Sequence, residues 1–305
     1  MLVYDRLETP AGLVVTHRSP LSIDELRSVQ RDAERGRLVR LRRGVYVDAD
    51  RWRAADPASR AVMQLHAYAA SAPRPPTFCH ESAALLLGLP LLTHDPAVIH
   101  VMAASDSGGR PSDGVRRHRP KLAFWPTVVQ GLRVTPPAVT VVDLCSALPL
   151  RDAVVVADAA LRSGVPREAL EITAQSAARR GSRKIALAMA LASPLSESVG
   201  ESLSRVTIHE LGLPAPVLQH EFRDRLGFIG RVDFWWPRDQ VIGEFDGQVK
   251  YLGRHEERPE VTVWREKLRE DRLGALGPRV VRWIWRDLQE PRRLFAALTA
   301  AGLGR

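Results

Sequence analysis

Three acidic residues in the C-terminal third of the chain have the type and spacing of a metal-binding carboxylate cluster. Glu244 and Asp246 are two residues apart in an apolar run, and side chains two apart in a strand point to the same face of a sheet. Asp233 lies in the preceding apolar run, so a hairpin would bring it beside them. Carboxylate oxygens select Mg²⁺ or Mn²⁺, which polarise a phosphate and lower the pKa of bound water. The pattern predicts phosphodiester hydrolysis.

Three more residues are candidates for completing such a site. Glu201 belongs to a predicted helix upstream, where it either assists the metal or, with Ser198, forms a Ser-x-x-Glu capping box. The protein has only four lysines among its 44 lysine and arginine residues, and two of them follow the acids. Lys250 comes one short turn after the third strand and is the preferred catalytic lysine. Lys267, on the next helix, is the alternative.

Each acid also has a structural interpretation. Asp233 has Arg231 two residues before it on the same strand face, and the two could form a surface ion pair, which contributes little to stability. Asp246 precedes Gly247, and Asp-Gly is a common turn dipeptide. The hypothesis of a metal site therefore requires all three carboxylates to converge.

The elements that must position these residues are readable from periodicity and breakers. Helices are predicted at residues 198–211 and 263–276, and strands at residues 219–222, 230–236, 241–247 and 280–285. In this order they predict a mixed sheet flanked by helices.

This region resembles the restriction-endonuclease-like superfamily, and within it a family of unknown function related to very-short-patch repair nucleases. The residues that carry the resemblance are Glu201, Ser202, Arg205, Gly212-Leu213-Pro214, Gln219, Arg231-Val232-Asp233-Phe234, Glu244-Phe245-Asp246-Gly247, Lys267, Arg269-Glu270-Asp271 and Val280-Val281-Arg282-Trp283. The resemblance implies that Asp233 and Glu244 ligate the metal and that Glu201 assists. The chain departs from the family pattern at Asp246, which occupies a position where the family usually has a lysine.

A basic segment near the N-terminus predicts contact with nucleic acid. Residues 22–35 form a predicted helix that Ser22 and Glu25 cap, and two β-prone runs follow on either side of a short turn. Helix and hairpin together are typical of a winged helix. The five arginines suited to phosphate contact are Arg35, Arg37, Arg40, Arg42 and Arg43. The alternative is a solvated strand edge protected by charge.

Residues 36–162 resemble the AbiEi-type antitoxins of abortive-infection (type IV toxin–antitoxin) systems. The carrying segments are Gly36-Arg37-Leu38-Val39-Arg40-Leu41-Arg42-Arg43-Gly44-Val45-Tyr46, His80-Glu81-Ser82-Ala83-Ala84, Gly88-Leu89-Pro90, Ile99-His100-Val101 and Thr140-Val141-Val142-Asp143-Leu144. The resemblance implies a DNA-binding winged helix and a regulatory α/β domain. Residues 1–20 look extended, however, so a complete helix-turn-helix is not expected.

Composition and charge indicate the kind of partner and the cellular compartment to expect. The formal charge of +9 and the pI near 10.3 favour a polyanionic partner such as nucleic acid. No apolar run is long enough to span a membrane, and the N-terminus lacks a secretory signal. The two cysteines, Cys79 and Cys145, indicate neither a disulfide framework nor a structural metal, so a cytoplasmic protein is expected. We expect His80, His100 and Asp143 to be structural.

The sequence therefore predicts an α/β protein of mixed α+β type in four segments. These are a winged-helix-like basic segment (1–55), an α/β antitoxin-like domain (56–165), a helical linker (166–193) and a restriction-endonuclease-like domain (194–305). The predicted function is a Mg²⁺- or Mn²⁺-dependent nuclease acting on DNA. The alternatives are a non-catalytic DNA-binding regulator and an antitoxin that binds a toxin protein.

Overall fold

The chain is a mixed α/β protein made of two compact units. The computed structural model describes residues 12–17, 22–103, 114–177, 182–247 and 259–304. One unit comprises residues 1–144 with 175–177, and the other comprises residues 145–174 with 178–305. Across the described residues, every helix is too short or too polar to cross a membrane.

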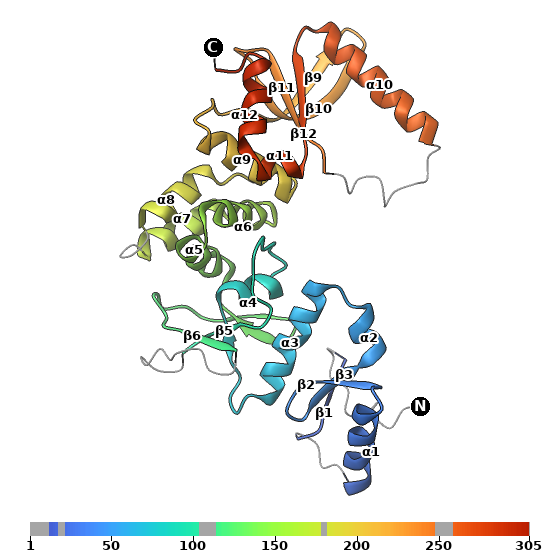
Figure 1. The fold of residues 1–305 in the computed structure, drawn as a ribbon. Coiled ribbons are helices and arrows are strands. Elements are labelled where there is room, and N and C mark those ends of the chain that lie inside the picture. Colours follow the sequence, from blue (N-terminus) through green and yellow to red (C-terminus); the bar gives the residue numbers. More distant parts are fainter. Residues whose placement is uncertain (1–11, 18–21, 104–113, 178–181, 248–258, 305) are drawn as a thin grey trace. The chain divides into compact units, whose positions relative to one another are not determined.

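The first unit begins with a small antiparallel sheet against one helix (Figure 1). Its elements are β1 (Leu13–Val15), α1 (Ile23–Glu34), β2 (Leu38–Arg42) and β3 (Val45–Asp48), with strand order β1-β3-β2. Ser22 and Glu25 form the predicted capping box at the start of α1. The hairpin is also confirmed, and β1 adds a third strand beside β3. Between residues 22 and 48 the structure has one helix, α1, and most of residues 1–20, which we expected to be extended, lie outside the described residues.

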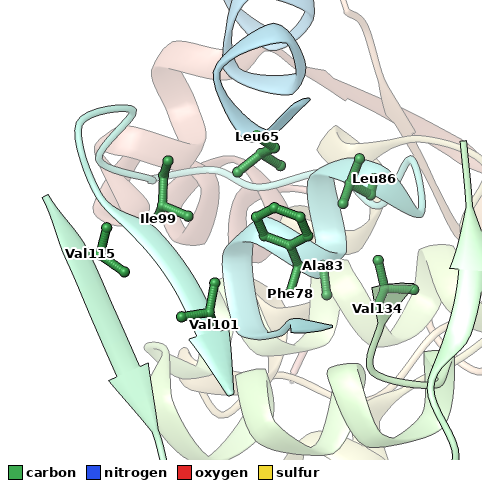
Figure 2. Close-up of a cluster of buried hydrophobic side chains, with 8 residues drawn as sticks. All are labelled: Leu65, Phe78, Ala83, Leu86, Ile99, Val101, Val115 and Val134. Carbon is green, nitrogen blue, oxygen red and sulfur yellow. The ribbon is translucent and has the colours of Figure 1, made fainter. Parts of the chain in front are cut away.

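A second sheet of five strands forms the main core of this unit. The elements are α2 (Ala49–Ala54), α3 (Pro57–Ser71), β4 (Thr77–Phe78), α4 (His80–Leu86), β5 (Ile99–Met102), β6 (Val115–His118), β7 (Thr127–Val129) and β8 (Leu132–Val134). The strand order is β6-β5-β4-β8-β7. Figure 2 shows Phe78 at the centre of the core, between Leu65 of α3 and Val101 of β5.

Helices dominate the start of the second unit. They are α5 (Pro137–Ala147), which contains the boundary, α6 (Leu150–Arg162), α7 (Arg167–Ser176) and α8 (Ser182–Leu191). Asp158 of α6 is fully buried and forms an ion pair with the largely buried guanidinium of Arg205. The same carboxylate accepts a hydrogen bond from the backbone N–H of Ser193, at 2.7 Å. Arg205 is one of the residues that carry the resemblance to the restriction-endonuclease-like superfamily. Its ion pair with Asp158 joins α6 to the helix that contains residue 205.

The second unit continues as a four-stranded mixed sheet flanked by helices, as predicted (Figure 1). Its elements are α9 (Val199–Glu210), β9 (Val217–Asp224), β10 (Gly227–Trp236), β11 (Val241–Phe245), α10 (Pro259–Ala275), β12 (Arg279–Trp283), α11 (Trp285–Gln289) and α12 (Pro291–Ala300). The strand order is β12-β11-β10-β9, in which β11 and β12 are parallel and the other pairs antiparallel.

Alternation along β11 assigns its residues to the two faces of this sheet. Trp283 of β12 donates a hydrogen bond to Ser204 of α9 at 2.7 Å. A Cβ on Gly200, at the start of α9, would collide with the ring of Phe245. α9 therefore covers the Phe245 face. Glu244 points the other way, toward α10.

Candidate functional site

Three acidic residues lie at the point where the pairing of β10 with β11 ends. The last paired residues are Phe234 and Gly243, the neighbours of Asp233 and Glu244, and Glu244 pairs in turn with Arg282 of β12. Glu244 lies on the side of the sheet that α10 covers, and the Asp233 carboxylate lies against the backbone of β11. Asp233, Glu244 and Asp246 are called the carboxylate row below.

Glu244 is the most strongly partnered carboxylate of the row. One of its oxygens forms an ion pair with Arg269 of α10, and the other accepts from Nε of Arg282 at 3.0 Å. Arg282 also pairs with Glu270. These two carboxylates raise the pKa of the Arg282 guanidinium against the effect of its burial. The chain therefore supplies Glu244 with positive charge from two arginines.

The other two acids are held by the backbone around β11. The Asp233 carboxylate accepts a hydrogen bond from the N–H of Phe245 at 2.9 Å. Asp246 donates its own N–H to the carbonyl of Trp283 at 2.8 Å, and it lies directly after β11. Arg231, the alternative ion-pair partner for Asp233, pairs instead with Glu197 at 2.5 Å.

Glu201 has the contacts of a helix cap together with one link to the sheet. Its carboxylate is buried and accepts from the Ser198 hydroxyl and from the Glu197 N–H, each at 2.8 Å. It also accepts from the side-chain amide of Gln219 at 2.9 Å. In the β9–β10 register Gln219 falls opposite Asp233, and its φ of 53° is unusual for a residue other than glycine. Glu201 is thus tied to the row through Gln219, from the helix on the opposite face.

The two candidate lysines have different outcomes. Lys250 and the neighbouring Gln248 lie outside the described residues. Lys267 is exposed on α10, two positions before Arg269. Two positions on a helix are about 200° of rotation, and Arg269 is the residue that faces Glu244. An arginine therefore occupies the position that we expected for Lys267.

The acids fit a hard divalent cation in the chemistry of their donor atoms. Asp233 and Glu244 supply carboxylate oxygens beside β11, and Asp246 lies directly after that strand. They do not form a trio with all donor atoms within 4.8 Å of one another, and the single trio of that kind among the described residues lies elsewhere. A cation at Glu244 requires at least one arginine to withdraw.

The predicted phosphate-binding arginines of the N-terminal hairpin divide into two sets. Arg37 forms an ion pair with Asp32, and the guanidinium of Arg42 lies over the ring of Tyr68 at 5.3 Å. The remaining three are exposed: Arg35, Arg40 and Arg43. The sequence gave no reason to distinguish the five, whereas the fold engages Arg37 and Arg42 within the protein and also Arg40, whose Nε donates to the carbonyl of Arg42 at 3.4 Å.

The trio of close donor atoms is a second cluster, which the sequence did not predict. It consists of Cys79, His80 and His118, whose sulfur and nitrogen donors lie within 4.8 Å of one another. The rings of His80 and His118 are stacked at 3.7 Å between centroids. His100 joins them, since its Nδ1 lies 3.0 Å from Nε2 of His118 and 2.9 Å from a carboxylate oxygen of Glu81. These four, Cys79, His80, His100 and His118, are called the histidine–cysteine cluster below.

The environment of this cluster keeps Cys79, His80 and His118 uncharged. Burial, with the charge of neighbouring His118, lowers the pKa of His80 to about 3. Burial and His100 lower the pKa of His118 to about 4. Burial also raises the pKa of the Cys79 thiol. At neutral pH, therefore, the two imidazoles are neutral and the thiol is protonated.

A weak signal for the cluster exists in the sequence. Cys79 and His80 are adjacent, but His100 and His118 lie in separate apolar and basic runs. No short motif contains the set, and only the pairing of β5 with both β4 and β6 brings its parts together. The sequence therefore gives no spacing by which these donor atoms could be grouped with Cys79.

A similar protein occurs in Mycobacterium tuberculosis. It is the uncharacterized protein Rv2248 of strain ATCC 25618 / H37Rv, and MT2308 in strain CDC 1551 / Oshkosh. Each is 32% identical to this chain over 226 residues, which are 72% of this chain and 79% of the mycobacterial protein. No family model matches the chain.

Proposed function

This chain belongs to the same family as the uncharacterized M. tuberculosis protein Rv2248, and from its own side chains we propose that it is a metal-dependent nucleic-acid phosphodiesterase that acts on DNA. The observation that supports the proposal is the closeness of three acids at the end of β11. Glu244 and Asp246 lie on either side of Phe245, and the N–H of Phe245 donates a hydrogen bond to the Asp233 carboxylate. Two carboxylates on paired strands are held by the sheet itself, and such rigid placement favours a defined metal site.

The residues of the carboxylate row and the side chains that contact it can be given roles in this activity. Asp233 and Glu244 would hold Mg²⁺ or Mn²⁺, with Asp246 beside them, and Glu201 would position the row through Gln219. When bound, such a cation polarises a phosphate and lowers the pKa of its water. Arg269 and Arg282 carry planar guanidinium groups at the same carboxylate. Guanidinium groups bind phosphate oxygens well, so on release from Glu244 these arginines would contact the substrate.

The N-terminal hairpin supports DNA as the substrate. Arg35, Arg40 and Arg43 are exposed there, and the chain as a whole carries a formal charge of +9. Contacts from exposed arginines to phosphates position a protein on a duplex without reading its sequence. In this proposal the hairpin holds DNA while the C-terminal sheet cleaves it.

The test is a cleavage assay on plasmid and single-stranded DNA, with Mg²⁺, with Mn²⁺ and with a chelator. We expect cleavage only with metal, and a loss of more than about 100-fold in Asp233→Asn and Glu244→Gln, because a catalytic metal contributes several kcal/mol to the transition state. Glu270→Gln is the matched control. It removes another carboxylate partner of Arg282 but leaves the row intact, so its activity should stay near that of the wild type.

A second candidate function is a non-catalytic DNA-binding regulator, which the pairing of Glu244 with two arginines favours. Ion pairs within the chain can replace a metal as the source of positive charge. A regulator would bind DNA with steep salt dependence and would bind equally well after Asp233→Asn and Glu244→Gln. Metal-independent binding without any cleavage in the assay above would establish this function in place of the nuclease.

A further inference from the structure

We propose that the histidine–cysteine cluster of the first unit is a binding site for a borderline-soft divalent transition metal, Zn²⁺ in the first place, with Cys79, His80 and His118 as ligands. The site lies where β4 passes into α4 and where β5 pairs with β6. It is separate from the carboxylate row and does not depend on the nuclease proposal.

The donor atoms are of the types that bind zinc, and the distances between them are close to those of a tetrahedral zinc site. A thiolate and two imidazoles select zinc over magnesium, because sulfur and nitrogen are softer ligands than carboxylate oxygen. Tetrahedral zinc holds its ligand atoms roughly 3.4–3.8 Å apart, as bond lengths of 2.0–2.3 Å imply. The donors of Cys79, His80 and His118 lie within 4.8 Å of one another. Small side-chain rotations therefore bring them into coordination.

The surroundings of His80 support a metal site independently of the distances between donor atoms. Its Nδ1 is buried and has no hydrogen-bond partner within the described part of the chain, and only 6% of the residue is exposed. Buried polar atoms in native proteins are nearly always bonded. The backbone of His80 is also left-handed, with φ at 49°. Strained backbone of this kind is retained where a side chain must be aimed at a particular point.

The surroundings provide the outer contacts that metal-binding histidines need. Nε2 of His118 lies 3.0 Å from His100, and His100 lies 2.9 Å from Glu81. Both contacts are made by Nδ1 of His100. When His118 ligates through its Nδ1, its Nε2–H donates to Nδ1 of His100, and a hydrogen bond of this kind fixes the orientation of a ligating histidine. The backbone of His100 is itself held, because its N–H donates to the Ser82 hydroxyl at 2.8 Å and its carbonyl accepts from Cys79.

Three protein ligands leave the fourth tetrahedral position for water or a substrate atom, the arrangement of catalytic rather than structural zinc sites. Asp143 and Lys121 form an ion pair at 3.1 Å close enough to influence the Cys79 thiol. A charged pair beside an open metal position can bind a polar ligand.

The test is titration of the metal-free full-length protein with Co²⁺ and then Zn²⁺. We expect one equivalent of Co²⁺ to give the visible absorption of a tetrahedral ion together with a thiolate-to-cobalt charge-transfer band, and Zn²⁺ to displace it. Cys79→Ser should remove the charge-transfer band and weaken binding roughly 100-fold. Cys145→Ser is the matched control, since Cys145 is an equally buried cysteine outside the cluster, and it should leave the spectrum unchanged.

His118→Gln is a second variant that separates loss of metal binding from loss of the fold. His118 is only partly buried, so its replacement should leave the fold intact. It should keep the circular dichroism spectrum of the wild type and lose Co²⁺ affinity to the same extent as Cys79→Ser. His100→Gln should weaken binding less, about tenfold, as expected of an outer contact. A Co²⁺ spectrum without a charge-transfer band, or one that His118→Gln leaves intact, would overturn the proposal. Neither result bears on DNA cleavage, which is measured with Mg²⁺.

Discussion

The two units of this protein gather ionisable side chains in opposite ways. In the second unit Asp233 accepts from the backbone of β11, and Glu244 is neutralised by Arg269 and Arg282. In the first unit His80 and Cys79 belong to a buried cluster whose burial keeps the imidazole and the thiol uncharged. The carboxylate of Glu244 is stabilised by the opposite charges of two arginines, whereas His80 and Cys79 are stable in their buried cluster because they carry no charge.

This difference predicts different responses to metal. At the carboxylate row an incoming cation competes with two guanidinium groups, so binding is weakened by the chain's own charges. At the histidine–cysteine cluster the buried Nδ1 of His80 has no described partner, so a metal displaces nothing there except the Cys79 proton. We therefore expect tight zinc binding in the first unit and weak magnesium binding in the second.

The largest effect that tests this contrast is expected from His80→Asn. Asparagine tolerates the left-handed backbone of position 80, and the loss of the buried, stacked imidazole should lower metal-free stability by about 1–3 kcal/mol. The wild type should gain about 2.7 kcal/mol when free Zn²⁺ is about 100 times its Kd, and the variant should lose that gain. Thermal unfolding with and without Zn²⁺ measures both quantities.

Gln130→Asn is the matched control for this experiment. Gln130 also has a positive φ, at 50°, but it is exposed and lies outside the cluster. Its zinc-dependent stabilisation should equal that of the wild type. If His80→Asn kept the full effect of Zn²⁺, His80 would not be a ligand and the contrast between the units would fail.

A smaller effect is expected at the carboxylate row from Arg269→Gln. This change removes one guanidinium from Glu244, so Mn²⁺ affinity should rise about tenfold, or about 1.4 kcal/mol. The loss of the free Mn²⁺ resonance in electron paramagnetic resonance measures the affinity. Asp233→Asn in the same background should cancel the gain.

Arg272→Gln is the corresponding control. Arg272 lies on the same helix but pairs with Asp224 instead of Glu244, so its replacement should leave Mn²⁺ affinity unchanged. Equal affinities for the wild type and Arg269→Gln would show that the arginines do not compete with a metal, which favours the regulator over the nuclease.

The smallest effect concerns an ion pair of the same sheet that belongs to neither site. The Arg272 guanidinium lowers the pKa of Asp224 through paired hydrogen bonds of 2.6 and 2.9 Å. A lowered carboxyl pKa contributes stability above the ordinary value near 3.8, and that contribution disappears as the pH falls through the lowered value. Asp224→Asn should therefore lower the melting temperature slightly at pH 6 and progressively less toward acid pH.

Glu221→Gln serves as the reference for this measurement. Glu221 pairs with the neighbouring Arg223 at 3.3 Å on an exposed surface, and such pairs contribute little. A similar pH dependence in both variants would mean that the Asp224 contribution is a general effect of charge and not of its bidentate geometry.

Local patterns in the sequence predicted much of the secondary structure. The capping box of Ser22 and Glu25 starts α1 as expected, and β10 and β11 form the predicted antiparallel hairpin. These features succeed because they depend on residues close in the chain. Caps, turns and strand alternation are fixed by local geometry.

Contacts between residues distant in sequence were decided only by the tertiary structure. The sequence did not show that Arg269 reaches Glu244, because arginines are spread along the whole chain and any of them could have done so. It likewise gave no reason to join His80 to His118, which meet only because β5 runs beside β6. Periodicity predicts the face on which a side chain lies, whereas its charged or metal-binding partners depend on how the elements pack.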